Sequence, residues 1–455
     1  APFVIGGGPC TYNPEPLAPF FDMFYIGESE TVYYDLMDIY KEHKEQGGSR
    51  QEFLKKAAQV PGIYVPSLYN VTYHEDGTIA SMEPNCPEAP KTVLRQVQMD
   101  LDNTFYPEKP LVPYIKVTQD RCVLEIQRGC TRGCRFCQAG MVYRPLRERS
   151  LSMLERVAEN SLKATGNDEI SLSSLSSSDY RHLPELCNYL IDNFRSKNIN
   201  IALPSLRIDA FSLDVMSKVQ DVRKSSLTFA PEAGTQRMRD VINKGLTEEV
   251  ILHGAEEAFK GGWNKVKLYF MMGLPTETEE DMKGIAHLCE KVAMHYYKLD
   301  SQYRNGRVSV GASCSFFVPK PFTPFQWASM CEEEEYTRRA HLVNDEFKAQ
   351  HNRRSLSFKY HDAKTTVLEG ILARGDRRIA DVIYSAYKKG CLYDAWTEYF
   401  HYDRWMEAME ENGLDYHFYT TRERSLDEIF PWDFIEIGLT KEFLKTEWEN
   451  AMEGK

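Results

Sequence analysis

Three closely spaced cysteines are the residues of this chain best suited to metal chemistry. They are Cys130, Cys134 and Cys137, within residues 125–149. Their CxxxCxxC spacing lets one loop hold a single metal centre. A closed zinc site usually takes four ligands in two separated pairs, and a four-iron cluster also takes four, normally thiolates. Three thiolates with no obvious fourth close by would leave one iron open to a small chelating molecule.

The loop also carries charges and glycines that suit such a centre. Arg128, Arg132 and Arg135 would offset the negative charge of three thiolates and favour their deprotonated form. Glycines let the backbone close around a bulky inorganic core, and the loop has three of them, Gly129, Gly133 and Gly140. A zinc knuckle or unrelated cysteines remain open alternatives, because three spaced cysteines alone are a moderate signal.

With Phe136 before the last cysteine, the loop reads CxxxCxΦC and resembles the signature of the radical SAM superfamily. The resemblance implies a [4Fe-4S] cluster whose fourth iron binds the amino and carboxylate groups of S-adenosylmethionine. It further implies one-electron cleavage of the sulfonium to methionine and a 5′-deoxyadenosyl radical. The electron would come from a low-potential donor of the flavodoxin or ferredoxin type.

Repeated strand and helix patterns over residues 112–325 would position this loop. Apolar segments alternate with amphipathic ones, which indicates a parallel sheet covered by helices, an α/β fold. The six predicted strands are CVLEIQ, EISLSSL, NIALPS, SLTFAP, KVKLYFMMG and RVSVGASCSFFV. Six such units make a partial (β/α)6 TIM-like barrel, whose chemistry would lie at the carboxyl ends of the strands. The cysteine loop follows the first strand.

The later strand ends supply residues that, by the same resemblance, would hold S-adenosylmethionine. The serine run after the second strand would hold the methionine amino group, with Ser174 and Ser176 as candidates. Arg207, after the third strand, would lie near the carboxylate of the cofactor, although Asp209 could equally be its structural partner. Glu232, after the fourth strand, would bond the ribose or the amino group.

The fifth strand ends in the turn Gly273, Leu274 and Pro275, which resembles the family's GLPGET turn and would lie against adenine. Other charged or polar residues are possible neighbours of a ligand, but a structural role is the default for them: Arg239, Lys244, Lys320 and Gln326. A dense cluster of charged residues is predicted to form an ion-pair network rather than a site for a substrate anion: Arg374, Asp376, Arg377 and Arg378. His361 and Cys391 do not make a second metal site.

The remaining segments divide the chain into further expected domains. Residues 1–48 resemble the C-terminal part of a cobalamin-binding-like Rossmann domain, so the intact protein could bind cobalamin. We expect the chain to be an N-terminally truncated fragment, because it begins inside a structural unit without methionine. Residues 49–111 are predicted to be an adaptor with a hairpin at Asp76-Gly77. Residues 112–328 would be the barrel, and residues 329–455 a mainly helical extension.

The composition and net charge of the chain argue against some classes of function. The chain has 455 residues, a net charge of −12 and eleven cysteines. Such an acidic chain disfavours broad electrostatic binding to nucleic acid, although a local basic patch remains possible. We find no apolar run that could span a membrane and expect a reducing, cytoplasmic location. The substrate stays open between RNA, protein and a small molecule, and a non-catalytic metal-binding module is the competing class.

Overall fold

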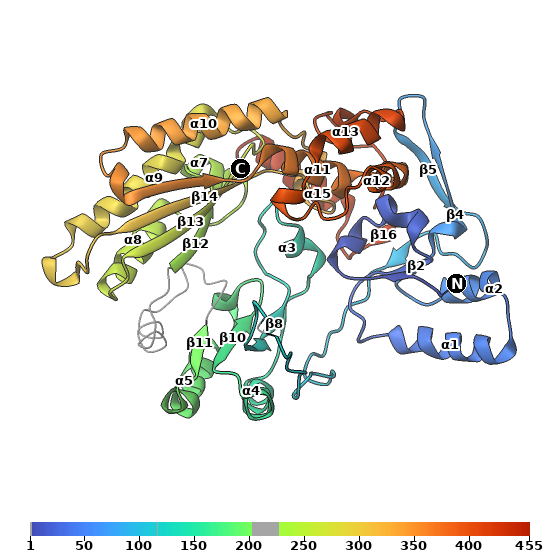
Figure 1. The fold of residues 1–455 in the computed structure, drawn as a ribbon, viewed down its shortest axis with the longest axis horizontal. Helices are drawn as coiled ribbons and strands as arrows, with labels where there is room; N and C mark the ends of the chain where they lie inside the picture. The colour runs from blue at the N-terminus through green and yellow to red at the C-terminus, as the bar shows by residue number, and fades with distance from the viewer. Residues whose placement is uncertain (1, 116, 203–226) are drawn as a thin grey trace. The chain divides into compact units, whose positions relative to one another are not determined.

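The chain folds into two compact units in this computed structural model, which describes residues 2–115, 117–202 and 227–455. Unit 1 consists of Ala1–Met99, Phe317–Glu335 and Asp362–Trp448, and unit 2 consists of Asp100–Phe316, Tyr336–His361 and Glu449–Lys455. Both mix helices with short sheets (Figure 1), which confirms the predicted α/β class.

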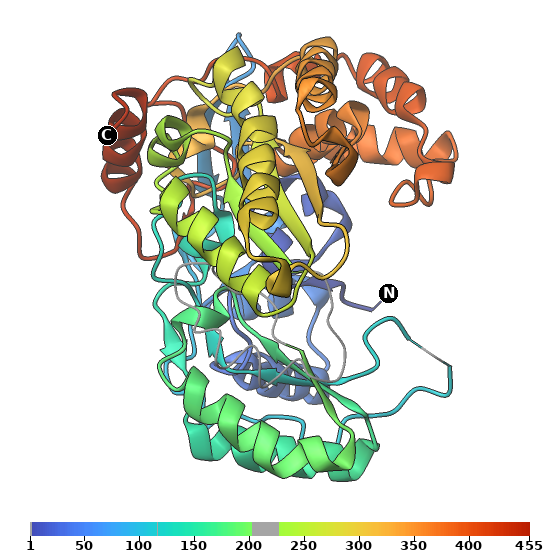
Figure 2. The ribbon, with the colours of Figure 1, turned by 90° about the vertical axis from the view of Figure 1, so that its left-hand side faces the viewer.

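The first sheet of unit 2 has three parallel strands. In spatial order they are β11 (Asn200–Ala202), β10 (Glu169–Ser173) and β7 (Cys122–Glu125). The helices α4 (Leu151–Thr165) and α5 (Leu183–Phe194) pack side by side against this sheet (Figure 2). Helix α4 begins after Ser150, whose hydroxyl accepts a hydrogen bond from the N–H of Met153 and caps the helix.

The second sheet of unit 2 has four parallel strands. In order they are β12 (Leu227–Glu232), β13 (Lys265–Met272), β14 (Ser309–Phe316) and β15 (Leu356–Tyr360). Buried residues alternate with more exposed ones along β13 and β14, so one face of the sheet is packed. The helices beside it are α7 (Gln236–Val241), α8 (Glu248–Lys260), α9 (Glu279–Lys298) and α10 (Glu333–Ala349).

Each of the six predicted strands corresponds to a strand of these two sheets, which confirms the repeated strand–helix pattern. The strand β15 is a seventh strand in these sheets. It lies in the residues expected to form a mainly helical extension, and the structure pairs it in parallel with β14. The predicted helix LDVMSKVQ lies outside the described residues.

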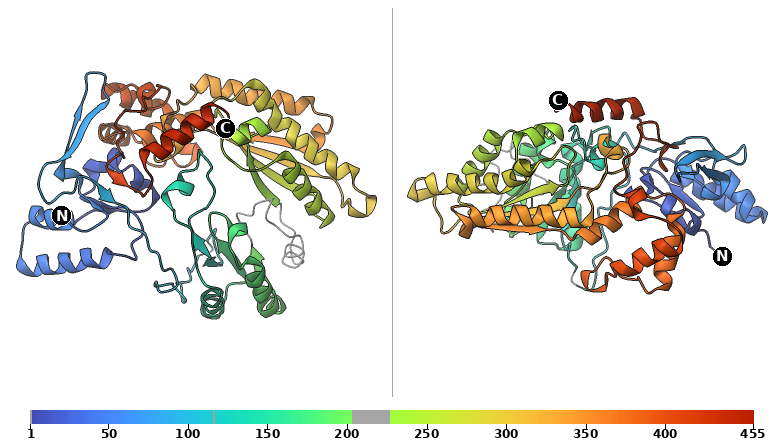
Figure 3. Two further views of the ribbon diagram at one scale, coloured as in Figure 1. Left: turned by 180° about the vertical axis from the view of Figure 1, so that it is seen from behind. Right: turned by 90° about the horizontal axis from the view of Figure 1, so that it is seen from above.

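Unit 1 contains a small sheet, a hairpin and a group of helices. The strands β1 (Ile5–Gly6), β2 (Met23–Tyr25) and β3 (Ile63–Tyr64) form the sheet beside α1 (Tyr33–Gln46) and α2 (Arg50–Ala57). The strands β4 (Tyr69–Tyr73) and β5 (Ile79–Pro84) form the hairpin predicted at Asp76-Gly77, a two-stranded ribbon in Figure 3. The strand β6 (Val93–Leu94) pairs in parallel with β16 (Ile435–Glu436).

Four helices of unit 1 share an apolar core. They are α11 (Ala363–Arg374), α12 (Ile379–Lys388), α13 (Tyr402–Glu411) and α14 (Tyr416–Tyr419). The last helix of the chain is α15 (Lys441–Met452). In the part of the chain that the structure describes, no helix is long and apolar enough to cross a membrane.

Candidate functional site

The cysteine loop leaves the end of β7 and is closed at its base by a short antiparallel pair. The strand β8 (Gln127–Arg128) pairs with β9 (Arg147–Glu148), and the three cysteines lie between them. Gly129 has a φ of 87°, and a Cβ there would lie 2.6 Å from the carbonyl oxygens of Tyr143 and Pro145. Only glycine therefore fits where the loop turns back on itself.

The three thiols differ in burial. Cys134 is buried, whereas Cys130 and Cys137 are half-buried. The sulfur of Cys137 caps α3 (Gln138–Val142) and accepts a hydrogen bond from the N–H of Gly140 at 3.3 Å. Burial raises the pKa of Cys134 to about 11 and also raises the pKa of Cys137. Metal binding at these thiols would therefore release protons.

The arginines of the loop donate to carboxylates and to a backbone carbonyl. Arg128 donates to Glu125, and Arg132 makes two hydrogen bonds to Asp179, at 2.5 and 3.1 Å. The buried guanidinium of Arg135 donates to the carbonyl oxygen of Val241 at 2.9 Å. Carboxylates and carbonyls are stronger acceptors than thiols, so they take the guanidinium donors.

Lys244 supplies positive charge near the thiols. It lowers the pKa of Cys134 and of Cys137, opposing the effect of burial. Its ammonium nitrogen lies 3.2 Å from Glu232 Oε1 and 5.9 Å from the centre of the Phe136 ring, within the range of a cation–π contact. Sequence reasoning named Lys244 only as a possible ligand neighbour.

The loop is docked onto the end of α7 by backbone contacts that sequence reasoning missed. The N–H of Arg135 donates to the carbonyl of Ile242 at 3.0 Å, and the side-chain amide of Asn243 donates to the carbonyl of Gly133 at 3.1 Å. Asn243 has a φ of 50°, a conformation in which asparagine is common. These contacts bring the thiols close to the charged groups beyond β12.

Glu232 ends β12 in an unusual backbone conformation. Its φ is 68°, and the register of β12 against β13 shifts between Phe229 and Glu232. Burial raises the pKa of Glu232, whereas the charge of Lys244 lowers it. The arrangement places a carboxyl group, a lysine and three thiols in one region, as expected for the first and fourth strand ends.

The serine run is tied to the cysteine loop by an acid that the sequence reading overlooked. Ser176 is buried and donates to Asp179 at 2.7 Å, and Asp179 is the partner of Arg132. The carbonyl of Ser176 accepts from the Gln127 side chain at 2.7 Å. Ser174 shares a hydrogen bond of 2.9 Å with Ser177. The acid at the end of SSSDY is the signal that could have indicated this link.

The turn after β13 is held from inside by a buried carboxyl. Gly273 has a φ of 89°, and its N–H donates to Glu277 at 2.6 Å. Arg339 of α10 contacts the same carboxyl oxygen at 3.0 Å. Burial raises the pKa of Glu277 to about 7 despite both partners. The turn of Gly273, Leu274 and Pro275 therefore has a fixed backbone.

The other candidate residues make structural contacts or lie outside the described residues. Arg207 and Asp209 lie outside the described residues. The buried Arg239 donates to the carbonyls of Ala233 and Leu246, and Gln326 accepts from the Trp432 indole at 2.9 Å.

The remaining charged candidates lie in unit 1. Lys320 pairs with Glu369. Arg377 pairs with Glu15 at 3.0 Å and Arg378 with Asp376 at 2.6 Å, which confirms the predicted ion-pair network.

The donor set of the loop fits an iron–sulfur cluster. Among the residues that the structure describes, no three His, Cys, Asp or Glu side chains converge on a position for one metal ion. A cluster does not require this convergence, because each thiolate binds a different iron. Three thiols on a short turn, one of them bonded by a backbone N–H, suit such a group.

Comparisons with known proteins agree with this assignment. Residues 124–289 match the family model described as the radical SAM superfamily, and residues 1–66 match the model for the N-terminal part of radical SAM proteins. The uncharacterized protein MJ0966 of Methanocaldococcus jannaschii is 29% identical over 90% of this chain and 79% of its own length.

Two further similarities are more distant. The uncharacterized methyltransferase PH0819 of Pyrococcus horikoshii is 24% identical over 65% of this chain and 59% of its own length. The solved structure of the cobalamin-dependent S-adenosylmethionine radical enzyme OxsB aligns with 99% of this chain and 66% of its own, at 14% identity and a TM-score of 0.46. The chain thus spans less than two thirds of both proteins.

Proposed function

The chain belongs to the radical SAM superfamily, and on this premise we propose that it binds a [4Fe-4S] cluster and cleaves S-adenosylmethionine reductively. Cys130, Cys134 and Cys137 would hold the cluster. When bound, the cluster would supply one electron to the sulfonium, which yields methionine and a 5′-deoxyadenosyl radical able to take hydrogen from a substrate.

The residues of the strand ends would bind and orient S-adenosylmethionine. Ser174 and Ser176 would face its amino group, with the bond between Asp179 and Arg132 fixing the serine run against the cysteine loop. Glu232 would accept a hydrogen bond from the ribose or amino group, and Arg207 would face the carboxylate. The backbone of Gly273, Leu274 and Pro275 would lie against adenine.

One observation favours this proposal over a zinc site. Three thiols lie in a loop held by Gly129 and docked onto α7, next to the pair of Glu232 and Lys244. A zinc protein would need a fourth ligand for a closed site. The loop instead offers three thiol ligands, which is the number that a four-iron cluster with one open iron requires.

Anaerobic reconstitution tests the proposal. The protein is loaded with iron and sulfide, reduced with dithionite and incubated with labelled S-adenosylmethionine. We expect about four iron and four sulfide per chain and release of 5′-deoxyadenosine. One zinc per chain, with no cleavage of the cofactor, would support the metal-binding module and refute the enzyme.

The physiological electron donor would be a low-potential flavodoxin or ferredoxin. Replacing dithionite with each reduced protein, with its oxidised form as the control, tests this choice. Equal cleavage with the oxidised form would contradict it. The substrate class stays open between protein, RNA and small molecules.

A second candidate reaction is cobalamin-dependent methyl transfer. Methyl transfer is supported by the similarity to PH0819, a protein named as a methyltransferase, and the role of cobalamin is the part that the experiment tests. Adding cobalamin to the reconstituted protein distinguishes the two, because methyl transfer releases S-adenosylhomocysteine whereas radical formation releases 5′-deoxyadenosine. An unchanged product ratio would exclude the second candidate.

A further inference from the structure

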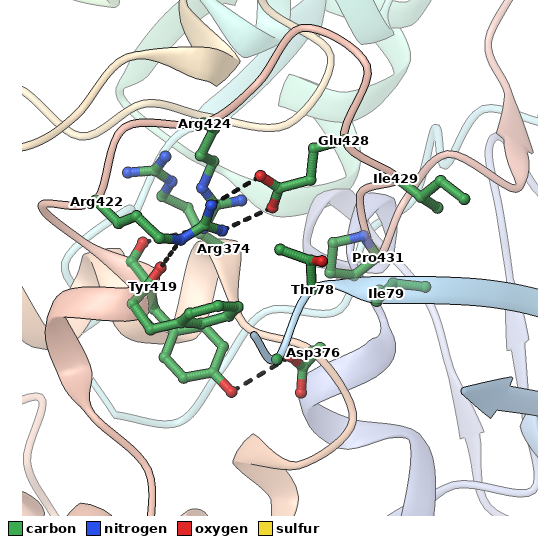
Figure 4. A pocket seen from close by; sticks show the side chains of 12 residues that line it. Thr78, Ile79, Arg374, Asp376, Tyr419, Arg422, Arg424, Glu428, Ile429 and Pro431 are labelled. Atoms are coloured by element: carbon green, nitrogen blue, oxygen red, sulfur yellow. Dashed lines mark hydrogen bonds and ion pairs between the residues drawn. The ribbon is translucent and has the colours of Figure 1, made fainter. Parts of the chain in front are cut away.

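The charged side chains around a small cavity of unit 1 bind one another (Figure 4). Glu428 accepts two hydrogen bonds from Arg422, at 2.7 and 2.8 Å, and Asp376 accepts one from the hydroxyl of Tyr419 at 3.3 Å. These contacts join the segment after α11 to residues 418–431, which is a structural role. The surface between α12 and α13 differs, because it exposes large apolar side chains.

Four large side chains between α12 and α13 are exposed together. Leu392, Tyr393, Trp396 and Tyr399 are each 53–60% exposed. The ring of Tyr393 lies 6.2 Å from that of Trp396 and 6.0 Å from that of Tyr399, so these side chains form one surface, the aromatic patch. Single exposed apolar side chains are normal in folded proteins, but a contiguous group indicates a contact surface. Tryptophan and tyrosine also contribute much of the binding energy at protein interfaces.

An open hollow of about 400 Å³ adjoins the aromatic patch. Its wall is formed by the start of α11 and by residues 397–404. Two acidic and two basic side chains line it, so its own charges balance: Asp362, Asp403, Lys364 and Arg404. The hollow therefore gives this surface relief, and the charge of the surface comes from the acids around it.

Acidic side chains predominate around the aromatic patch. Lys389, just before it, pairs with Glu407 and Glu411 at 3.1 and 2.7 Å. In the part of the chain that the structure describes, the exposed Glu398 and Asp403 belong to no ion pair. Residues 391–411 contain one basic side chain, Arg404, and six acidic ones: Asp394, Glu398, Asp403, Glu407, Glu410 and Glu411. The surface around the patch is therefore negatively charged.

Rings beside carboxylates are complementary to arginine. The guanidinium group is planar and weakly hydrated, stacks on aromatic faces and pairs with carboxylates. A cation already lies over one exposed ring of this surface, since Lys388 is 5.6 Å from the ring centre of Tyr384. The phosphates of a nucleic acid would be repelled by the same carboxylates. Charge thus favours a basic protein over RNA as the partner.

We propose that the aromatic patch docks a positively charged segment of another protein. Arginine side chains of that segment stack on Trp396 and Tyr399 and pair with Glu398 and Asp403. The proposal concerns unit 1 alone and does not depend on the group that the cysteine loop binds.

A labelled peptide tests this surface on the whole chain. A fluorescein-labelled peptide of alternating arginine and glycine is titrated with the protein at physiological ionic strength, and fluorescence anisotropy is measured. We expect saturable binding, and binding about 3-fold weaker for the matched lysine peptide, because an ammonium group stacks less well on rings. No saturable binding, equal binding of both peptides, or tighter binding of a labelled oligouridylate would overturn the proposal.

Two variants assign the binding to the aromatic patch. W396A removes one exposed ring and should weaken binding of the arginine peptide about 10-fold. E398Q/D403N should weaken it as well and reduce its dependence on salt. Y34A is the matched control, since Tyr34 of α1 is 73% exposed in the same unit, and it should bind the peptide as the unaltered protein does. Unchanged binding by W396A, or an equal loss in Y34A, would refute the assignment.

Discussion

Individual arginines in two regions of the chain bind different kinds of acceptor. In the cysteine loop, Arg128 and Arg132 each face a carboxylate, so their charges are matched. In unit 1, Arg374 and Arg424 are buried and donate to backbone carbonyls. Which acceptor an arginine binds depends on the groups that folding brings within its reach.

The largest expected effect on activity comes from replacing the cysteines of the loop. This change should leave the stability of unit 1 unaffected. Replacing Cys130, Cys134 or Cys137 with alanine should lower the iron content and reduce 5′-deoxyadenosine release by more than about 100-fold, since even outer partners of a metal site are worth about 10- to 100-fold in activity. Iron analysis and mass spectrometry measure both. Cys187→Ala, which changes a buried residue of α5, is the control and should keep its iron. Full iron content in any of the three variants would contradict the ligand assignment.

In unit 2, the buried carboxyl of Glu277 pairs with an arginine, and burial shifts the pKa of the carboxyl. The pKa of Glu277 is raised from 4.5 to about 7 in the folded chain. The folded state then binds more protons than the unfolded state between these values, so its stability falls as the pH rises through this range. E277Q and the unaltered protein differ in unfolding free energy, and this difference should change by about 3 kcal/mol over the pH range between the two pKa values.

Chemical denaturation at pH 5, 6 and 7 measures this difference. E279Q is the matched control, because Glu279 is the exposed partner of Arg338. Its profile should run parallel to that of the unaltered protein. A parallel profile for E277Q would show that Glu277 is ionised throughout.

Removing a buried arginine of unit 1 should affect stability but not the metal centre. Arg374 donates to the carbonyls of Thr420 and Ala328 at 2.9 and 3.0 Å. R374L leaves both buried carbonyls without this donor and should cost about 2 kcal/mol of unfolding free energy. Iron content should stay unchanged. R304L, at an exposed position, serves as the control, and an equal loss of stability in both variants would contradict the role of Arg374.

The smallest effect concerns the link between the serine run and the cysteine loop. D179N weakens the pair with Arg132 and should raise the dissociation constant of S-adenosylmethionine about 10-fold. Equilibrium binding to the reconstituted protein measures it, with iron content as a second readout. D345N, on the exposed side of α10, is the control. An unchanged affinity in D179N would separate the serine run from the cofactor.

The sequence predicts the cysteine loop, the six strands and most helices, because their signals are local. Thr278 and Asp281, for example, form a capping box that begins α9 where the pattern predicts it. The partners of the arginines could not be predicted, since Arg132 and Asp179 lie 47 positions apart. The same holds for the pairing of β15 with β14. Pairing depends on the edge that the preceding sheet leaves open.

The interleaving of the two units along the chain has a consequence for biosynthesis. The polypeptide passes from one unit to the other after residues 99, 316, 335, 361 and 448. Residues 1–99 therefore cannot complete their unit until residue 448 has emerged from the ribosome. The apolar surface that residues 1–99 bury against the later segments of unit 1 is therefore exposed while those segments are being synthesised, when aggregation competes with folding.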